Sequence, residues 1–194
     1  LKKWNIFRET LVNKKKIFTL FLTSILIFGN WTVWIYAVST KKIIDASFGY
    51  FIFPIISVLF GFLFLKEKLN KKRILAIFLV LISTIYLFFN LSSLPWVGLA
   101  VALMWSIYNL LRKKINVDTD TGLLIESLFI LPIALIFFYF IVQTDQNDFS
   151  FDNPTLMFLI FLAGPMTVIP LFLYVKGVQL SGLGPSGMIF FITP

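Results

Sequence analysis

The sequence contains no cysteine and no histidine among its 194 residues. The absence of cysteine excludes thiol chemistry and disulfides, and the absence of histidine excludes imidazole-based metal sites and proton relays. No HExxH zinc motif, serine–histidine pair or glycine-rich phosphate loop occurs either. Because hydrolytic and ATP-driven sites depend on such groups, we expect neither an enzyme nor a bound metal or cofactor.

Charged residues are also scarce, at 13% of the chain, whereas 59% of the residues are hydrophobic and 18% are aromatic. The mean hydropathy of +0.92 lies far outside the range of soluble domains. The net charge of +8 is spread over short basic clusters between apolar runs, and not over one solvated face as in a nucleic-acid-binding protein. We therefore expect an integral membrane protein that contacts lipid and has no nucleic-acid partner.

Six apolar runs have about the 20-residue length that a helix needs to cross a bilayer. They lie at residues 17–39, 47–65, 74–89, 94–111, 123–142 and 155–175, and a seventh begins at Ser186. Because strict alternation of polar and apolar residues is absent, the runs predict helices and not barrel strands. The sequence thus predicts an all-α, polytopic helix bundle. Residues 1–16 are charged throughout and are expected to form a connecting loop. The start at Leu1 and the end inside an apolar run favour a fragment.

The basic residues also predict the orientation in the membrane. Fifteen of the 17 fall in residues 1–16, 66–73 and 112–114 and at Lys176, on one side of the predicted spans. Only Lys41 and Lys42 fall on the other side. Because Lys and Arg are retained on the cytoplasmic side, the first set is expected to be cytoplasmic.

A weak internal repeat is found when the chain is aligned with itself so that Pro54 falls on Pro194. This alignment matches further residue pairs in two consecutive spans: Phe18 with Phe158, Phe21 with Phe161, Leu22 with Leu162, Val38 with Val178, Phe51 with Phe191 and Ile52 with Ile192. Five spans fit within one period, so the second copy is expected to enter the membrane upside down. Inverted repeats of this kind are typical of transporters that alternate between inward-open and outward-open states.

Proline interrupts the apolar runs at related places, in IDASFGYFIFP (44–54) and in SGMIFFITP (186–194). Proline frees backbone carbonyls, which membrane proteins tolerate where the backbone lines a cavity or packs against other helices. Four residues are hinge or helix-break candidates on this ground: Gly49, Pro54, Pro170 and Pro194. The alternative is that proline is simply common in membrane helices.

Several ordered motifs resemble the RarD-type subfamily of the EamA transporters, in the drug/metabolite transporter superfamily. They are Asn30-Trp31, DASFGYFIFP (45–54), SLPWVGLA (93–100), LLRKK (110–114) and VDTDTGLLIES (117–127). The resemblance implies ten helices in two inverted five-helix repeats and an inner-membrane transporter, from a subfamily named for an association with chloramphenicol sensitivity. Residues 1–89 would hold a cytoplasmic loop and the last three helices of the first repeat. Residues 94–194 would hold the second repeat, truncated in its fourth helix.

Three positions depart from the subfamily pattern, which tends to place Asn at Phe53, Gly at Asn109 and Gln at Phe190. If these positions line the substrate cavity, the cavity is more aromatic than is usual in the subfamily.

Four residues are candidates for contact with a substrate. Asn30 lies near the middle of the first span, where a polar amide needs a partner, so it either faces a pocket or bonds to another helix. Trp34 lies one turn further on the same face. Tyr50 and Trp105 could complete an aromatic wall with it, although lipid-facing aromatics are also common.

Glu126 is the only acidic residue expected well inside a span. It could carry a proton, bind a cationic group, or pair with Arg112 or Lys113 at the interface. Lys176 is expected to extend toward the lipid headgroups, and the cluster at 65–73 to contact them.

Two functions remain open on this evidence. The first is a secondary transporter of a small organic solute, metabolite or drug in the bacterial inner membrane, with possible proton coupling. The second is a non-transporting component, such as an assembly partner or receptor subunit. A channel is disfavoured because no ring of charges or filter-like loop is visible.

Overall fold

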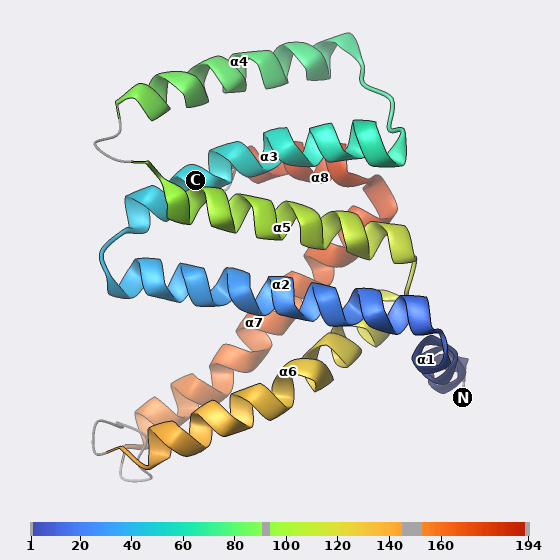
Figure 1. Cartoon of the computed structure of the whole chain (residues 1–194), viewed down its shortest axis with the longest axis vertical. Helices are drawn as coiled ribbons and strands as arrows, with labels where there is room; N and C mark the ends of the chain where they lie inside the picture. Colours follow the sequence, from blue (N-terminus) through green and yellow to red (C-terminus); the bar gives the residue numbers. More distant parts are fainter. Residues whose placement is uncertain (1, 91–93, 145–152, 193–194) are drawn as a thin grey trace. The chain divides into compact units, whose positions relative to one another are not determined.

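The computed structural model describes residues 2–90, 94–144 and 153–192, and all regular structure in these ranges is helical. Pro194, one of the hinge candidates, lies outside the described residues. The elements are α1 (Lys2–Val12), α2 (Lys14–Ser39), α3 (Ile43–Leu65), α4 (Lys71–Phe89), α5 (Trp96–Ile115), α6 (Thr119–Val142), α7 (Pro154–Ser181), α8 (Leu183–Ile189) and the 3₁₀ turn η1 (Phe190–Ile192). Figure 1 shows the course of these helices.

The helices fall into two compact units, which are described separately. Unit 1 comprises residues 1–24 and 117–176, and unit 2 comprises residues 25–116 and 177–194. Helices α2 and α7 each contribute a segment to both units, because the boundaries at residues 24 and 176 fall within them.

Five of the described helices are long and apolar enough to cross a membrane, namely α2, α3, α4, α6 and α7. Together with the absence of strands in the described ranges, they make the protein an integral membrane protein with an all-α, polytopic fold. The predicted spans at 17–39, 47–65, 74–89, 123–142 and 155–175 each fall largely within one of these helices. The seventh run corresponds to the short apolar helix α8 and its continuation η1.

Helix α5 covers the remaining predicted span but is not apolar enough to be counted among these five. Its last turn carries three basic residues, Arg112, Lys113 and Lys114, which lower its hydropathy. The protein also buries Ser106, Asn109 and Arg112 of this helix, each at most 1% exposed. That α5 crosses the membrane therefore stays a prediction.

The prediction of a loop at residues 1–16 is wrong, because residues 2–12 form α1 and α2 begins at Lys14. The charges concealed an apolar face on which Trp4 and Phe7, three residues apart, stack with ring centroids 5.4 Å apart. Within unit 1, α1 contacts α6, and Lys3 donates to the Asp120 carboxylate. This hydrogen bond raises the pKa of Lys3 above its ordinary value.

In unit 2, α3 is the central helix and contacts α4, α5, α8 and η1. Figure 1 shows α3 between α4 and α5. The α3–α5 contact is close because two glycines meet, and a Cβ atom placed on Gly49 would lie 2.5 Å from the carbonyl oxygen of Gly98. Small residues allow helix backbones to approach closely in membranes. Nearby, Ala37, Ala46 and Val97 form a fully buried cluster.

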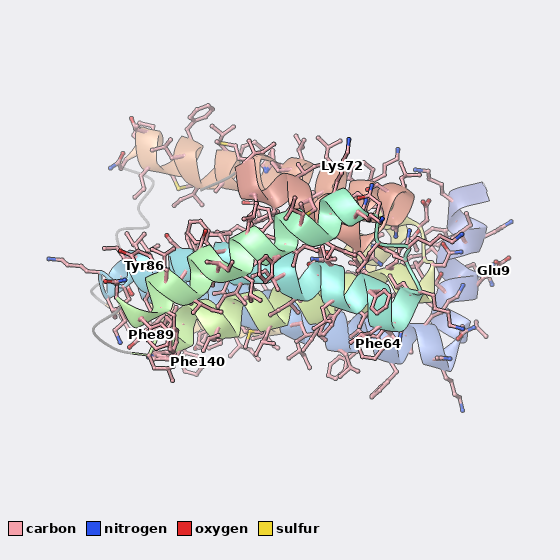
Figure 2. All side chains as sticks on the ribbon, turned by 90° about the horizontal axis from the view of Figure 1, so that it is seen from above. Glu9, Phe64, Lys72, Tyr86, Phe89 and Phe140 are labelled. Atoms are coloured by element: carbon pink, nitrogen blue, oxygen red, sulfur yellow. The ribbon has the colours of Figure 1, made fainter. Side chains whose placement is uncertain are left out.

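Most basic residues of unit 2 lie at one end of its helices, in residues 66–73 and 112–114. Lys41 and Lys42 precede the first residue of α3. After its last residue, Lys66 adopts a left-handed conformation that turns the chain toward α4. Helix α5 carries three basic residues in its last turn. In Figure 2, Lys72 lies toward one end of α4, and Tyr86 and Phe89 lie toward the other. The basic end is the one that the charge bias predicts to be cytoplasmic.

None of the internal prolines ends its helix. Helix α3 runs through Gly49 and Pro54, and α7 runs through Pro165 and Pro170. The helices thus continue through Gly49, Pro54 and Pro170 in this conformation, because a proline removes one backbone hydrogen bond while the neighbouring ones persist. A hinge function at these residues stays a prediction.

Candidate functional site

A pocket with a volume of about 180 Å³ lies within unit 2, between residues of α2, α3, α5 and η1. Its walls contain ten residues: Asn30, Trp31, Trp34, Gly49, Tyr50, Phe53, Val101, Ala102, Trp105 and Phe190. All four residues predicted to contact a substrate, Asn30, Trp34, Tyr50 and Trp105, are among them. The structure thus brings these four together around one cavity, and their role in binding stays a prediction.

Four aromatic rings form a continuous series along the pocket. The rings of Trp34 and Tyr50 meet edge to face at a centroid distance of 5.4 Å. Tyr50 stacks on Phe190 at 5.7 Å, and Phe190 meets Phe53 edge to face at 4.8 Å. Contacts of this geometry add stabilisation beyond the area that they bury and hold the rings in fixed orientations. The pocket therefore has an aromatic wall of defined shape.

Trp105 forms another part of the lining, from α5. Its ring stacks on that of Tyr108 at a centroid distance of 5.4 Å and an interplanar angle of 17°. Tyr108 is fully buried and does not line the pocket. Trp105 is thus supported from behind by a ring in the protein interior, which fixes its orientation toward the cavity.

Among the ten described lining residues, Asn30 has the only side-chain amide. Its Nδ2 donates to the backbone carbonyl of Val101 at 2.9 Å, so Asn30 joins α2 to α5 within unit 2. The sequence allowed either a hydrogen bond to another helix or a position in a pocket. In the structure, Asn30 both bonds to α5 and lines the pocket. None of the lining residues carries a charge.

Two lining residues, Phe53 and Phe190, were noted in the sequence only as departures from the subfamily pattern. Phe53 lies three residues after Tyr50, so helical spacing could have placed it on the same face. Phe190 is far from Tyr50 along the chain, and no local pattern indicates that they meet. The third departure, Asn109, is fully buried and is not part of the lining.

The remaining site candidates lie elsewhere. Gly49 lines the pocket, whereas Pro54 is buried one turn further along α3, against α8, where a Cβ atom on Gly187 would lie 3.5 Å from the Pro54 Cα. Pro170 lies on an exposed part of α7. Lys176 is exposed and holds its ammonium group 5.7 Å from the ring centre of Phe172.

Glu126 lies in unit 1 and is 3% exposed. Its Oε1 accepts a hydrogen bond of 2.6 Å from the hydroxyl of Thr23, which belongs to the α2 segment of the same unit. One turn away, the rings of Phe21 and Phe129 meet edge to face at 5.4 Å and pack the same two helices together. A buried carboxyl group held by a hydroxyl donor is chemically suited to take up and release a proton.

The chain is similar to known proteins along its whole length. The model of the EamA-like transporter family matches residues 2–89. The Protein RarD of Salmonella typhi is 33% identical over 193 residues, which cover 100% of this chain and 66% of that protein. The chain belongs to the EamA-like transporter family.

Two further relatives of this EamA-like chain are named as transporters. The Uncharacterized transporter YojE of Bacillus subtilis is 36% identical over 197 residues, which cover 100% of the chain and 65% of that protein. An uncharacterized transporter of Vibrio cholerae is 34% identical over 193 residues, covering 100% of the chain and 64% of that protein. The chain thus spans slightly less than two thirds of the length of these relatives. No solved structure matches it.

Proposed function

We propose that this EamA-like chain is part of a secondary transporter that moves a small organic solute across the bacterial inner membrane. The observation that carries the proposal is the uncharged aromatic pocket between α2, α3, α5 and η1. Concave, mainly apolar sites with a few polar groups are typical of small-molecule binding. The family membership and the membrane-length helices support the same function.

The size and chemistry of the pocket limit the solute that it could hold. Its volume of about 180 Å³ is close to that of an apolar cavity of about 150 Å³ that holds benzene, and below the roughly 300–1,000 Å³ of drug-sized sites. The pocket therefore suits one ring or a branched apolar group of a larger molecule. Its aromatic walls favour a neutral or a delocalised cationic group, and they disfavour a carboxylate or phosphate, which would find no opposite charge.

The proposed transport cycle uses two inverted five-helix repeats. Residues 1–89 would hold the last three helices of the first repeat, and residues 94–194 would hold the second repeat, truncated in its fourth helix. The support for the repeats is the alignment of the chain with itself, which pairs Pro54 with Pro194. Pro54 is buried near the pocket, on the side of α3 that contacts α8. The two halves would exchange conformations so that the pocket opens to each side of the membrane in turn.

Proton coupling through Glu126 is the second element of the proposal. Support comes from its burial and from the hydrogen bond with Thr23. A protonated carboxyl group can donate to a neighbour and an ionised one can only accept, so loss of the proton would change the bonding between α2 and α6. Such a change would link proton binding to the packing of unit 1.

Counterflow in proteoliposomes tests the proposal. Vesicles loaded with an unlabelled solute should accumulate the same solute in labelled form, and a panel of small aromatic and cationic solutes should be screened. Tyr50→Ala should raise the KM of an accepted solute. Phe62→Ala is the matched control, since Phe62 lies on the same helix, is 50% exposed and does not line the pocket. Folded protein that transports no solute of the panel would support a non-transporting membrane component instead.

A further inference from the structure

Unit 2 contains a second cavity, of about 610 Å³, at the basic end of its helices. It is lined by Leu65, Glu67, Lys68, Arg73, Lys113, Lys114, Leu180, Ser181, Gly182 and Pro185. Four of these side chains are cationic and one is acidic. The basic residues come from the α3–α4 connection, the first turn of α4 and the last turn of α5, so the fold gathers charges that are distant in sequence.

Contacts within unit 2 position the cationic groups around this basic cavity. The ammonium of Lys113 donates to the carbonyl oxygen of Gln179. The ammonium of Lys114 lies 4.7 Å from the ring centre of Phe64. The guanidinium of Arg73 lies 3.5 Å from the carbonyl oxygen of Lys68, and its backbone is fixed by the Asn70 side chain that caps α4.

The acidic residue of the cavity, Glu67, has another role. Its two carboxylate oxygens accept from the backbone N–H groups of Leu183 and Gly184, at 2.8 and 2.9 Å. Among the described residues, no ion pair joins Glu67 to a lysine or arginine of the cavity. The Glu67 carboxylate therefore links the segment between α3 and α4 to α8. With four cationic side chains and one carboxylate, the cavity lining has a net charge of three positive charges.

We propose that the basic cavity binds a phosphate group, as carried by an anionic phospholipid or by a phosphorylated solute. Lysine and arginine donors hold phosphate oxygens by charge-assisted hydrogen bonds, and the planar guanidinium suits them in particular. Basic pockets between membrane helices on the cytoplasmic side commonly hold anionic headgroups. The apolar part of the lining, which includes Leu180 at 80% exposure, would accept the start of an acyl chain.

The sequence supplies a matched control for this proposal. Lys71 and Lys72 belong to the same basic cluster as Lys68 and Arg73, and all four lie within six residues. Lys71 and Lys72 are exposed, and they do not line the cavity. Removing these two charges changes the net charge of the membrane surface as much as removing Lys68 and Lys114 does. A general attraction to anionic lipid would therefore respond equally to both double variants.

The experiment compares Lys68→Gln/Lys114→Gln with Lys71→Gln/Lys72→Gln, each purified in phosphatidylcholine nanodiscs with and without phosphatidylglycerol. Native mass spectrometry would count the phosphatidylglycerol retained per protein, and melting curves in phosphatidylcholine with added inorganic phosphate would detect a soluble ligand. We expect the Lys68→Gln/Lys114→Gln variant to retain about tenfold less phosphatidylglycerol, because it loses charge-assisted hydrogen bonds to the phosphate. The Lys71→Gln/Lys72→Gln variant should retain as much as the wild type. Arg73→Gln should repeat the first result.

The two arms distinguish the source of the phosphate group. Selective loss of phosphatidylglycerol assigns the basic cavity to a lipid headgroup. Stabilisation by inorganic phosphate that is lost only in the Lys68→Gln/Lys114→Gln variant assigns it to a phosphorylated solute. Equal loss in both double variants, or no loss in either together with no effect of phosphate, would overturn the proposal. These readouts do not depend on transport, so they stand apart from the proposed transporter function.

Discussion

Replacing Gly98 by alanine is expected to destabilise unit 2, because the added methyl group has no space between α3 and α5. A Cβ atom on Gly98 would lie 2.4 Å from the carbonyl oxygen of Asp45 and 2.8 Å from the backbone nitrogen of Gly49. Both are backbone atoms, which cannot turn away as a side chain can. Since non-bonded heavy atoms prefer separations of about 3.5–4.0 Å, α5 would have to move away from α3 by about 1 Å.

The expected loss follows from two opposing effects. Forcing an extra methyl group into a packed interior typically costs ~1–3 kcal/mol. Alanine in place of glycine improves helix propensity by up to ~1 kcal/mol. The net effect for Gly98→Ala is therefore a destabilisation of up to about 2 kcal/mol. The pocket should be affected as well, because the same helix pair supplies Gly49, Val101 and Ala102 to its lining.

Gly164→Ala is the matched control, because no atom lies within 4 Å of the position of its added Cβ. Gly164 lies inside α7, so only the gain in helix propensity applies and the protein should melt at the same or a higher temperature. Thermal melting of both purified variants in detergent measures the difference. If Gly98→Ala melts at or above the wild-type temperature, the close approach of α3 and α5 is refuted.

Three further predictions follow from the pocket, the buried carboxyl group and the charge bias. Phe53→Asn removes the edge-to-face contact with Phe190, which is worth ~0.5–1.5 kcal/mol, and should raise the KM of an aromatic solute roughly 2- to 10-fold. Glu126→Gln keeps the shape of the side chain but cannot release a proton, so accumulation driven by a pH gradient should be lost while solute exchange persists. Single cysteines at Lys71 and Asn147 should react with an impermeant reagent from opposite sides of the membrane.

Each of these predictions has a result that would contradict it. An unchanged KM in Phe53→Asn would place the aromatic solute outside the pocket. Gradient-driven uptake at the wild-type level in Glu126→Gln would remove that residue from proton coupling, and loss of folded protein would indicate a structural role. Labelling of both cysteines from the same side would refute the predicted orientation and the inverted repeat that depends on it.

The sequence predicted the membrane helices well because composition alone determines them. Five apolar runs became helices of membrane length, since a backbone in hydrocarbon must satisfy its own hydrogen bonds. Helix α1 was missed because its charges dominate the composition, while the face formed by Trp4 and Phe7 is only two residues wide. The run at 94–111 also became a helix, α5, which extends into the basic residues Arg112, Lys113 and Lys114.

The sequence predicted four lining residues, from α2, α3 and α5, but not the contribution of η1. Asn30 and Trp34 are one turn apart, so their shared face follows from helical spacing. The meeting of Tyr50 with Phe190 depends on tertiary packing between segments from opposite ends of the chain. The same holds for Glu126, because its hydrogen bond comes from Thr23, 103 residues earlier. The pairing of Glu126 with Arg112 or Lys113 stays a prediction.

A further prediction is that transport moves α8 against α3 within unit 2. The α3–α5 contact joins backbone to backbone at Gly49 and Gly98, which favours a rigid pair. Helix α8 is only seven residues long and is followed directly by η1, which carries Phe190 into the pocket wall. A displacement of α8 would therefore move Phe190 and change the access to the pocket.

A reversible crosslink tests this motion, and the 194 residues contain no cysteine of their own. A Cβ atom on Gly187 would lie 2.9 Å from the Ser57 Cβ, so an outward shift of α8 by roughly 0.6–1 Å would give the usual Cβ spacing of a disulfide, about 3.5–4.5 Å. The double variant Ser57→Cys/Gly187→Cys should lose counterflow when oxidised and regain it on reduction, while each single variant should be insensitive to the oxidant. This test depends on the proposed transport function. Full counterflow by the oxidised double variant, with the disulfide verified by mass spectrometry, would show that α8 stays fixed on α3 during transport, and the moving element would then have to be sought outside this helix pair.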